Sequence, residues 1–141
     1  MKSEGVFKGH CNCGQVTFEV RTASPDIYVC HCSICRRATG SIGVTVLVVP
    51  TGDFKWTSGE RLLKRWTKPG HDWQCSFCTE CGSHLPGDND AKSMYIPAGL
   101  ISQGQEQLKV AHHIWVSSKA PWHHIGDAGE QHEEAKGAVR K

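Results

Sequence analysis

Cysteines gathered in three short segments are the dominant feature of this sequence. All eight cysteines of the 141-residue chain fall within residues 11–13, 30–35 and 75–81. Thiols this close together are typical of metal sites, because neighbouring sulfurs can reach one ion. A framework of four disulfides is the alternative for an even number of cysteines. The N-terminal residues lack the apolar segment of a secretion signal, which favours a cytoplasmic chain with reduced thiols and therefore metal binding.

The first and third segments are predicted to build one structural zinc site. Two residues separate Cys78 from Cys81, so one turn can present both sulfurs to an ion, and a glycine follows them. Cys11 and Cys13, also followed by a glycine, supply the second pair of the four ligands that a closed tetrahedral site requires. Such a zinc would tie the first strand to the middle of the chain. The alternative is that these residues are free cysteines of the core.

The middle segment is predicted to bind a second zinc that is open to substrate. Cys30, Cys32 and Cys35 can present three sulfurs to one side of the chain. Three protein ligands with an open fourth position characterise catalytic zinc sites. An open zinc can bind a thiol and remove its proton, although a free thiol has a pKa of roughly 8.5. The alternative is that Cys75 or a histidine takes the fourth position and closes the site.

Short alternating or β-branched segments predict a mainly β fold. Residues 15–20 alternate between apolar and polar, whereas residues 42–49 are nearly all apolar and predict a strand buried on both faces. Residues 33–39 predict one helical turn, and residues 101–107 predict a short helix. Turn residues separate further expected strands at 54–57, 62–67, 94–96 and 109–116.

Length and charge limit the classes of protein. The chain is long enough for one domain, which we expect to span residues 1–125, followed by a polar tail at 126–141. Its formal net charge of +2 is too small for a dedicated nucleic-acid binder. The longest apolar run, residues 42–50, is shorter than the roughly 18 residues of a membrane span. We therefore expect no nucleic-acid or membrane partner, and the sequence indicates no particular oligomeric state.

Two groups of histidines accompany the cysteines. His31 lies between two expected zinc ligands, and in an extended segment its side chain points away from the metal, toward the surface or the surroundings of the site. The adjacent pairs at 112–113 and 123–124 can each direct only one member inward from a strand. We therefore expect mostly surface or structural roles for these pairs.

Four motifs occur in order between Gly9 and Trp122: G-H-C-N-C-G, C-H-C-S-I-C-R-R, F-C-T-E-C-G and H-I-W-V-S-S-K-A-P-W. With this combination the chain resembles the glutathione-dependent formaldehyde-activating enzyme family, which includes S-(hydroxymethyl)glutathione synthases, other carbon–sulfur lyases and centromere protein V. The resemblance implies a β-tent fold of packed antiparallel sheets, tied by a structural zinc and related to methionine sulfoxide reductase B. It implies a structural zinc on Cys11, Cys13, Cys78 and Cys81, and a catalytic zinc on Cys30, Cys32 and Cys35.

The activity implied by the resemblance is that of a zinc-dependent carbon–sulfur lyase or synthase. It would join a glutathione-type thiol to an aldehyde, as in the formation of S-hydroxymethylglutathione. Arg36 and Arg37 can bind the carboxylates of glutathione, or they can form a solvated helix face. Trp122 is a candidate substrate-binding residue in a cleft wall, or a core residue. The alternative functions are a non-catalytic, zinc-stabilised binding module and a thiol redox enzyme.

Overall fold

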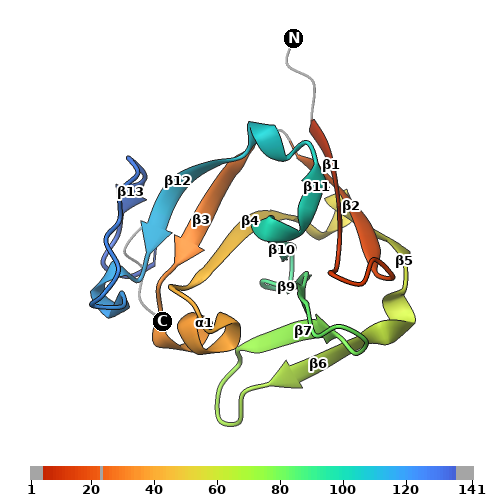
Figure 1. Cartoon of the computed structure of the whole chain (residues 1–141), viewed down its shortest axis with the longest axis horizontal. Helices are drawn as coiled ribbons and strands as arrows, with labels where there is room; N and C mark the ends of the chain where they lie inside the picture. The colour runs from red at the N-terminus through yellow and green to blue at the C-terminus, as the bar shows by residue number, and fades with distance from the viewer. Residues whose placement is uncertain (1–4, 23, 136–141) are drawn as a thin grey trace. The chain divides into compact units, whose positions relative to one another are not determined.

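The computed structural model describes residues 5–22 and 24–135 and is mainly β, as predicted. Figure 1 follows the chain in colour from β1 to β13, with α1 in orange. The chain divides into two compact units, unit 1 (residues 1–25 and 47–107) and unit 2 (residues 26–46 and 108–141). Across the described residues, no helix combines the length and apolar character needed to cross a membrane.

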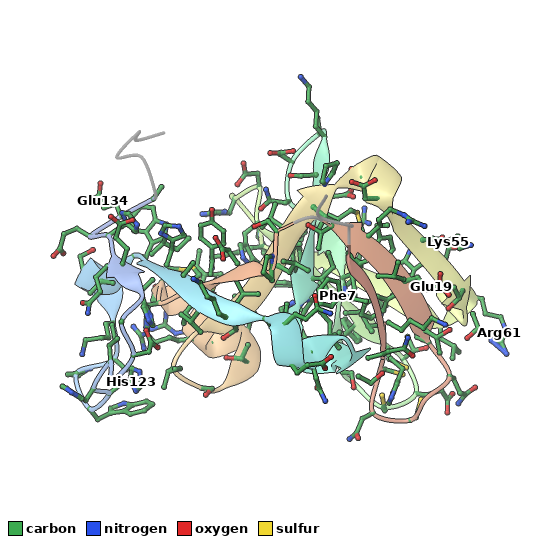
Figure 2. All side chains as sticks on the ribbon, turned by 90° about the horizontal axis from the view of Figure 1, so that it is seen from above. Phe7, Glu19, Lys55, Arg61, His123 and Glu134 are labelled. Atoms are coloured by element: carbon green, nitrogen blue, oxygen red, sulfur yellow. The ribbon has the colours of Figure 1, made fainter. Side chains whose placement is uncertain are left out.

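Unit 1 contains a four-stranded antiparallel sheet with the strand order β11-β1-β2-β5. Phe7 and Phe18 are buried. The residues that follow them, Lys8 and Glu19, point to the other face and form an ion pair there. This burial repeats every second residue, as expected of strands that have one covered face. Phe7 lies among the side chains of the unit and Glu19 lies at its edge (Figure 2). The strands are β1 (Gly5–His10), β2 (Thr17–Thr22), β5 (Phe54–Ser58) and β11 (Ile101–Gln103).

Two smaller groups of strands complete unit 1. A three-stranded antiparallel sheet of order β6-β7-β8 carries three of the chain's cysteines on or beside β7. The second group joins the end of β4 to β10 and β9. The strands are β6 (Leu63–Thr67), β7 (Gln74–Cys78), β8 (His84–Leu85), β4 (Val44–Pro50), β9 (Gly87–Asp88) and β10 (Ser93–Pro97). The 3₁₀ helices are η1 (Thr51–Asp53), η2 (Glu60–Leu62), η3 (Ala98–Leu100) and η4 (Gln105–Gln107).

Unit 2 contains a sheet with the strand order β13-β12-β3-β4. Only residues 44–46 of β4 belong to this unit. Strand β12 runs parallel to both β3 and β13, and β4 is antiparallel to β3. The elements are β3 (Asp26–Cys30), α1 (Ser33–Thr39), β12 (Lys109–Ile114), η5 (Val116–Ser118) and β13 (Glu130–Gln131). The segment set apart above as a polar tail thus contributes β13, while its residues 136–141 lie outside the described residues.

The structure corrects the prediction that residues 42–49 form a strand buried on both faces. Strand β4 begins at Val44, and its burial alternates in its second half. Leu47 and Val49 are buried, whereas Val48 is 37% exposed. A continuous apolar run was therefore compatible with a strand that has only one covered face.

The predicted helix at residues 101–107 is also wrong. Ile101 is buried and pairs with Gly9 of β1, so the first residues of this segment form β11. Gly104 then adopts a φ of 91°, which no helix accommodates, and only a single 3₁₀ turn follows at residues 105–107. Pairing with the open edge of β1 outweighs the weak helical tendency of the segment.

Candidate metal centres

The four-cysteine cluster (Cys11, Cys13, Cys78 and Cys81) lies in unit 1, where two turns meet. All four sulfurs lie within 4.8 Å of one another. The Cys11 and Cys13 sulfurs are 3.5 Å apart, and the Cys13 and Cys78 sulfurs are 3.9 Å apart. Four sulfurs around a tetrahedral zinc, each about 2.3 Å from the ion, are separated by about 3.8 Å. The cluster therefore has the donor atoms and the spacing of a closed zinc site.

Each pair of cysteines is held by a turn that needs a glycine. Gly14 and Gly82 both have a positive φ, 82° and 79°, although a side chain at either position would meet open space. The requirement is therefore one of backbone conformation. Gly14 N–H donates to the Cys11 carbonyl at 3.0 Å, and Gly82 N–H donates to the Cys78 carbonyl at 2.7 Å. These bonds curl each turn so that both of its sulfurs face the same point.

Ser83 joins the two turns and was not identified from the sequence. Its hydroxyl accepts the Asn12 N–H at 2.9 Å and donates to the Cys81 sulfur at 3.2 Å. The hydrogen bond from the Ser83 side chain, followed by the one from its backbone N–H, lowers the pKa of Cys81 to about 5. Cys81 is therefore held as a thiolate, the form that binds metal. In the sequence, Ser83 directly follows Cys81 and Gly82, and this position was the signal that could have identified its role beside the cluster.

The triplet (Cys30, Cys32 and Cys35) lies in unit 2, where β3 passes into α1. Its three sulfurs also lie within 4.8 Å of one another. Cys32 caps the helix, because its sulfur accepts the Cys35 N–H at 3.3 Å. The helix ends at Gly40, whose N–H donates to the Arg36 carbonyl at 2.8 Å. The predicted helical turn at residues 33–39 is confirmed, and it brings Cys35 back to the two sulfurs that precede it.

The thiols of the triplet share hydrogen bonds that concentrate negative charge on one sulfur. The side chains of Cys30 and then Cys35 lower the pKa of Cys32 by donating to its sulfur. The same interaction with Cys32 raises the pKa of Cys30, and hydrogen bonding with Cys30 and Cys32 raises the pKa of Cys35. The set therefore stabilises a thiolate at its centre, and three sulfurs form a soft donor set suited to zinc.

His31 is buried, so the part of the prediction that placed it at the surface is wrong. Its Nε2 lies 2.9 Å from Nδ1 of His113, and Nε2 of His113 lies 2.8 Å from the Asp127 carboxylate. Burial first, and then the neighbouring histidines, lower the pKa of His31. The hydrogen bond from His113 lowers the pKa of Asp127. The ionised carboxylate fixes the tautomers: His113 donates to Asp127 and accepts from His31.

Replacing His113 with alanine is expected to lower the free energy of unfolding by about 3 kcal/mol. The variant leaves a cavity in place of a side chain that is 3% exposed, and it removes the acceptor for buried His31. Urea unfolding of zinc-loaded protein measures the difference. His124→Ala, at an exposed position in the same unit, is the matched control and should change stability by less than about 0.5 kcal/mol. An equal loss of unfolding free energy in both variants would contradict a stabilising role for the hydrogen bonds that link Asp127, His113 and His31.

The predicted substrate residues differ in how firmly the structure holds them. Arg36 Nε donates to the Ser118 carbonyl at 3.2 Å, so this hydrogen bond holds the guanidinium group beside Ser118. Arg37 is exposed on the next position of α1. Trp122 follows η5 and is 72% exposed, which excludes a core role and leaves its indole available to a ligand. Cys75 lies on β7 in unit 1, where burial raises the pKa of its thiol.

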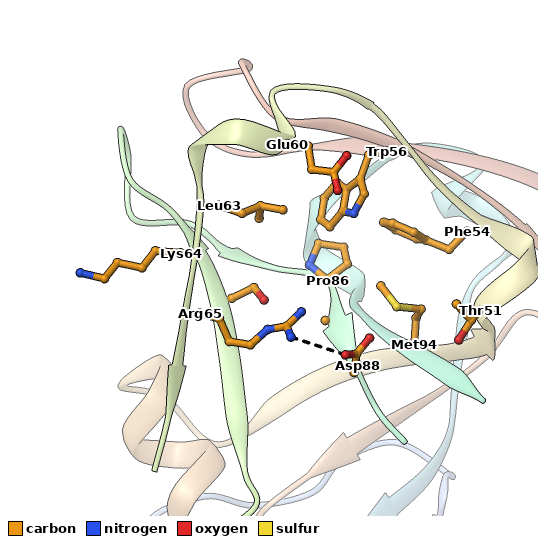
Figure 3. A pocket seen from close by; sticks show the side chains of 12 residues that line it. Thr51, Phe54, Trp56, Glu60, Leu63, Lys64, Arg65, Pro86, Asp88 and Met94 are labelled. Atoms are coloured by element: carbon orange, nitrogen blue, oxygen red, sulfur yellow. Dashed lines mark ion pairs between the residues drawn. The ribbon is translucent and has the colours of Figure 1, made fainter. Parts of the chain in front are cut away.

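Unit 1 also contains a pocket of about 440 Å³, lined in part by Trp56, Glu60 and Met94 (Figure 3). Arg65 and Asp88 face each other in it at 3.6 Å and are both about half exposed. None of the lining residues belongs to the four-cysteine cluster or to the triplet. Because Arg65 and Asp88 pair with each other, this pocket offers no unpaired charge from these two residues that would indicate a ligand.

Comparisons with known proteins identify a family and a fold that this chain shares. A family profile described as glutathione-dependent formaldehyde-activating enzyme matches residues 6–118. A curated protein from Halomonas elongata that carries this same family name is 31% identical over 90 residues, which cover 57% of this chain and 54% of that protein. The chain thus spans about half the length of this relative. The crystal structure of a Rhodobacter sphaeroides protein has the same fold, with a TM-score of 0.58 at 21% identity, covering 73% of this chain and 96% of that one.

Proposed function

Because the chain belongs to the glutathione-dependent formaldehyde-activating enzyme family, we propose that it is a zinc-dependent carbon–sulfur lyase or synthase. Its substrates would be a glutathione-type thiol and an aldehyde, with formaldehyde as the family's aldehyde. In the forward reaction the thiol sulfur bonds to the aldehyde carbon, and the thiol proton ends on the former carbonyl oxygen. The reverse reaction breaks the same carbon–sulfur bond and returns the proton to sulfur.

The convergence of three sulfurs in the triplet is the observation that carries this proposal. Cys30, Cys32 and Cys35 would hold a catalytic zinc, and three ligands leave a coordination position for a substrate. When bound there, zinc supplies a Lewis acid that favours the thiolate form of a coordinated thiol. The four-cysteine cluster, with a complete set of four ligands, would hold a structural zinc instead.

The protein groups around the triplet would position the substrate. The N–H of Cys35 fixes the Cys32 sulfur, and the cap at Gly40 fixes the short helix that carries both arginines. Arg36 and Arg37 would bind the carboxylates of glutathione, which a guanidinium can grip with two hydrogen bonds. Trp122 would cover the bound thiol with its exposed indole.

Alanine in place of Arg36 or of Arg37 is expected to weaken glutathione binding roughly 10- to 150-fold without loss of zinc. The basis is the loss of a hydrogen bond between charged groups, worth about 1.5–3 kcal/mol. Calorimetric titration of glutathione into zinc-loaded protein measures the change. Arg61→Ala, at an exposed position of unit 1, is the control and should bind glutathione as the parent does. Unchanged glutathione affinity in both Arg36→Ala and Arg37→Ala would show that the arginines do not bind the substrate.

The activity itself can be tested by magnetisation-exchange NMR on mixtures of glutathione and formaldehyde. The addition also proceeds without a catalyst, so the same mixture without protein gives the background rate. The proposal requires an exchange rate that rises in proportion to protein concentration. A rate equal to the background at every protein concentration would overturn it.

The state of the cysteines supports a reducing compartment. All eight are free thiols, and each lies in a described part of the chain. Disulfides form and persist in secreted proteins, whereas cytoplasmic thiols stay reduced and available to metal. We therefore propose a cytoplasmic location, with a small-molecule thiol as the partner.

A further inference from the structure

We infer that unit 2 carries a third metal site, formed by His112, Glu130 and His132, that takes a divalent transition-metal ion of the Zn²⁺ class. The site lies where β12 meets β13 and shares no residue with the four-cysteine cluster or the triplet. It is independent of the proposed activity. Two of its three ligands, Glu130 and His132, come from the segment that the sequence prediction set apart as a polar tail.

The three donor atoms form a nearly equilateral triangle. His112 Nδ1 lies 3.1 Å from His132 Nε2, and Glu130 Oε1 lies 3.3 Å from the first and 3.4 Å from the second. Ligands about 2.0–2.2 Å from a tetrahedral zinc are separated by about 3.3–3.6 Å. The triangle therefore matches one face of such a coordination shell, and a single ion can contact all three atoms.

Backbone pairing brings these residues together. His112 stands opposite Glu130 in the parallel register of β12 and β13. The next residues continue the pairing, because His132 N–H donates to the His113 carbonyl at 2.8 Å and Val116 N–H donates to the His132 carbonyl at 3.1 Å. The donors are thus attached to a hydrogen-bonded frame, which reduces the entropy lost when they bind an ion.

The ring of His112 is oriented by a neighbour outside the triangle. Tyr28 of β3 stacks on it, with ring centroids 5.0 Å apart and an interplanar angle of 26°. Both imidazoles are largely buried, whereas the Glu130 side chain is 67% exposed. An ion can therefore enter from the carboxylate side, and its remaining coordination positions face water.

The donor set selects the class of metal. Two imidazole nitrogens and one carboxylate oxygen suit Zn²⁺, Co²⁺ and Ni²⁺, whereas Ca²⁺ and Mg²⁺ prefer oxygen ligands alone. The same chemistry separates this site from the two cysteine sites, whose ligands are all sulfur. Sulfur-bound Co²⁺ has strong charge-transfer absorption that a nitrogen- and oxygen-bound Co²⁺ lacks. A spectrum can therefore report the third site alone.

The test supplies only two equivalents of Zn²⁺, which the sulfur ligands of the two cysteine sites bind in preference, and then titrates Co²⁺ into the full-length protein. The parent should bind one further equivalent, seen as weak d–d absorption without sulfur charge transfer. His112→Ala and His132→Ala should each weaken this binding at least tenfold, and so should Glu130→Gln. His124→Ala is the matched control for adventitious binding by surface histidines and should behave as the parent does. Circular dichroism shows whether each variant is folded.

Three results would overturn the inference. The first is a parent that binds no further equivalent, which would leave the three residues as a hydrogen-bonded group only. The second is an equal loss of binding in His124→Ala. The third is added cobalt that gives sulfur charge transfer and binds to His112→Ala as tightly as to the parent. Cys32→Ser separates this site from the proposed activity, because that variant should keep the third site whether or not the triplet is catalytic.

Discussion

The variant Cys78→Ser is expected to yield almost no soluble protein. Cys78 is fully buried beside Cys11, Val16 and Leu85, and its sulfur belongs to the four-cysteine cluster. A serine hydroxyl does not replace a thiolate as a zinc ligand. Binding of structural zinc contributes about 10–16 kcal/mol in small zinc domains, and a domain of this size is stable by only about 5–15 kcal/mol. Loss of most of the zinc-binding free energy is therefore as large as the whole stability of such a domain.

Soluble yield, zinc content and melting temperature measure this effect. Cys75→Ser is the matched control, since it makes the same substitution on the same strand at a residue outside both cysteine groups. The control should remain soluble and keep its zinc. A soluble Cys78→Ser protein with the parent's melting temperature and metal content would show that the cluster does not hold a structural ion.

The variant Cys32→Ser is expected to abolish saturable glutathione binding while the protein stays folded. The triplet has three ligands, so it loses its ion more readily than the closed cluster does. Serine is a favoured helix cap, and its hydroxyl can accept the Cys35 N–H that the Cys32 sulfur accepts in the parent. Helix α1 should therefore survive, and the melting temperature should change little.

Zinc content and calorimetric titration of glutathione into parent and Cys32→Ser protein decide this prediction. The variant should lose one equivalent of zinc, or bind it far more weakly, and show no glutathione binding. Cys75→Ser again serves as the control and should bind as the parent does. Equal binding by parent and Cys32→Ser would remove the triplet from the mechanism. Absence of binding in both would exclude glutathione as the substrate and leave the zinc assignment intact.

The elements that the sequence predicted well are those whose signal is local. Helix α1 is specified within a few residues by its cap at Cys32 and its end at Gly40. Both cysteine groups are recognisable because the spacing within each turn is itself the signal. Strands β1, β3 and β7 were not predicted: β1 contains two glycines, and the cysteines of β3 and β7 suggested metal ligands rather than strands.

The interactions that the sequence could not reveal join residues far apart in the chain. His31 and His113 are 82 residues apart, and no spacing rule links them or connects them to Asp127. The pairing of β11 with β1 likewise depends on an open sheet edge formed almost a hundred residues earlier. Local propensity at residues 101–107 carries no information about that edge, which is why a helix was predicted there.

The division of the chain into two interleaved units has a consequence for its synthesis on the ribosome. Each unit is assembled from two separated stretches, so neither can be completed from the first half of the chain. At about 5–20 residues per second, Cys13 emerges roughly 3–14 seconds before Cys81. The nascent chain therefore presents half of the four-cysteine cluster, and then the whole triplet, as exposed thiols before either β11 or β12 exists to complete its sheet.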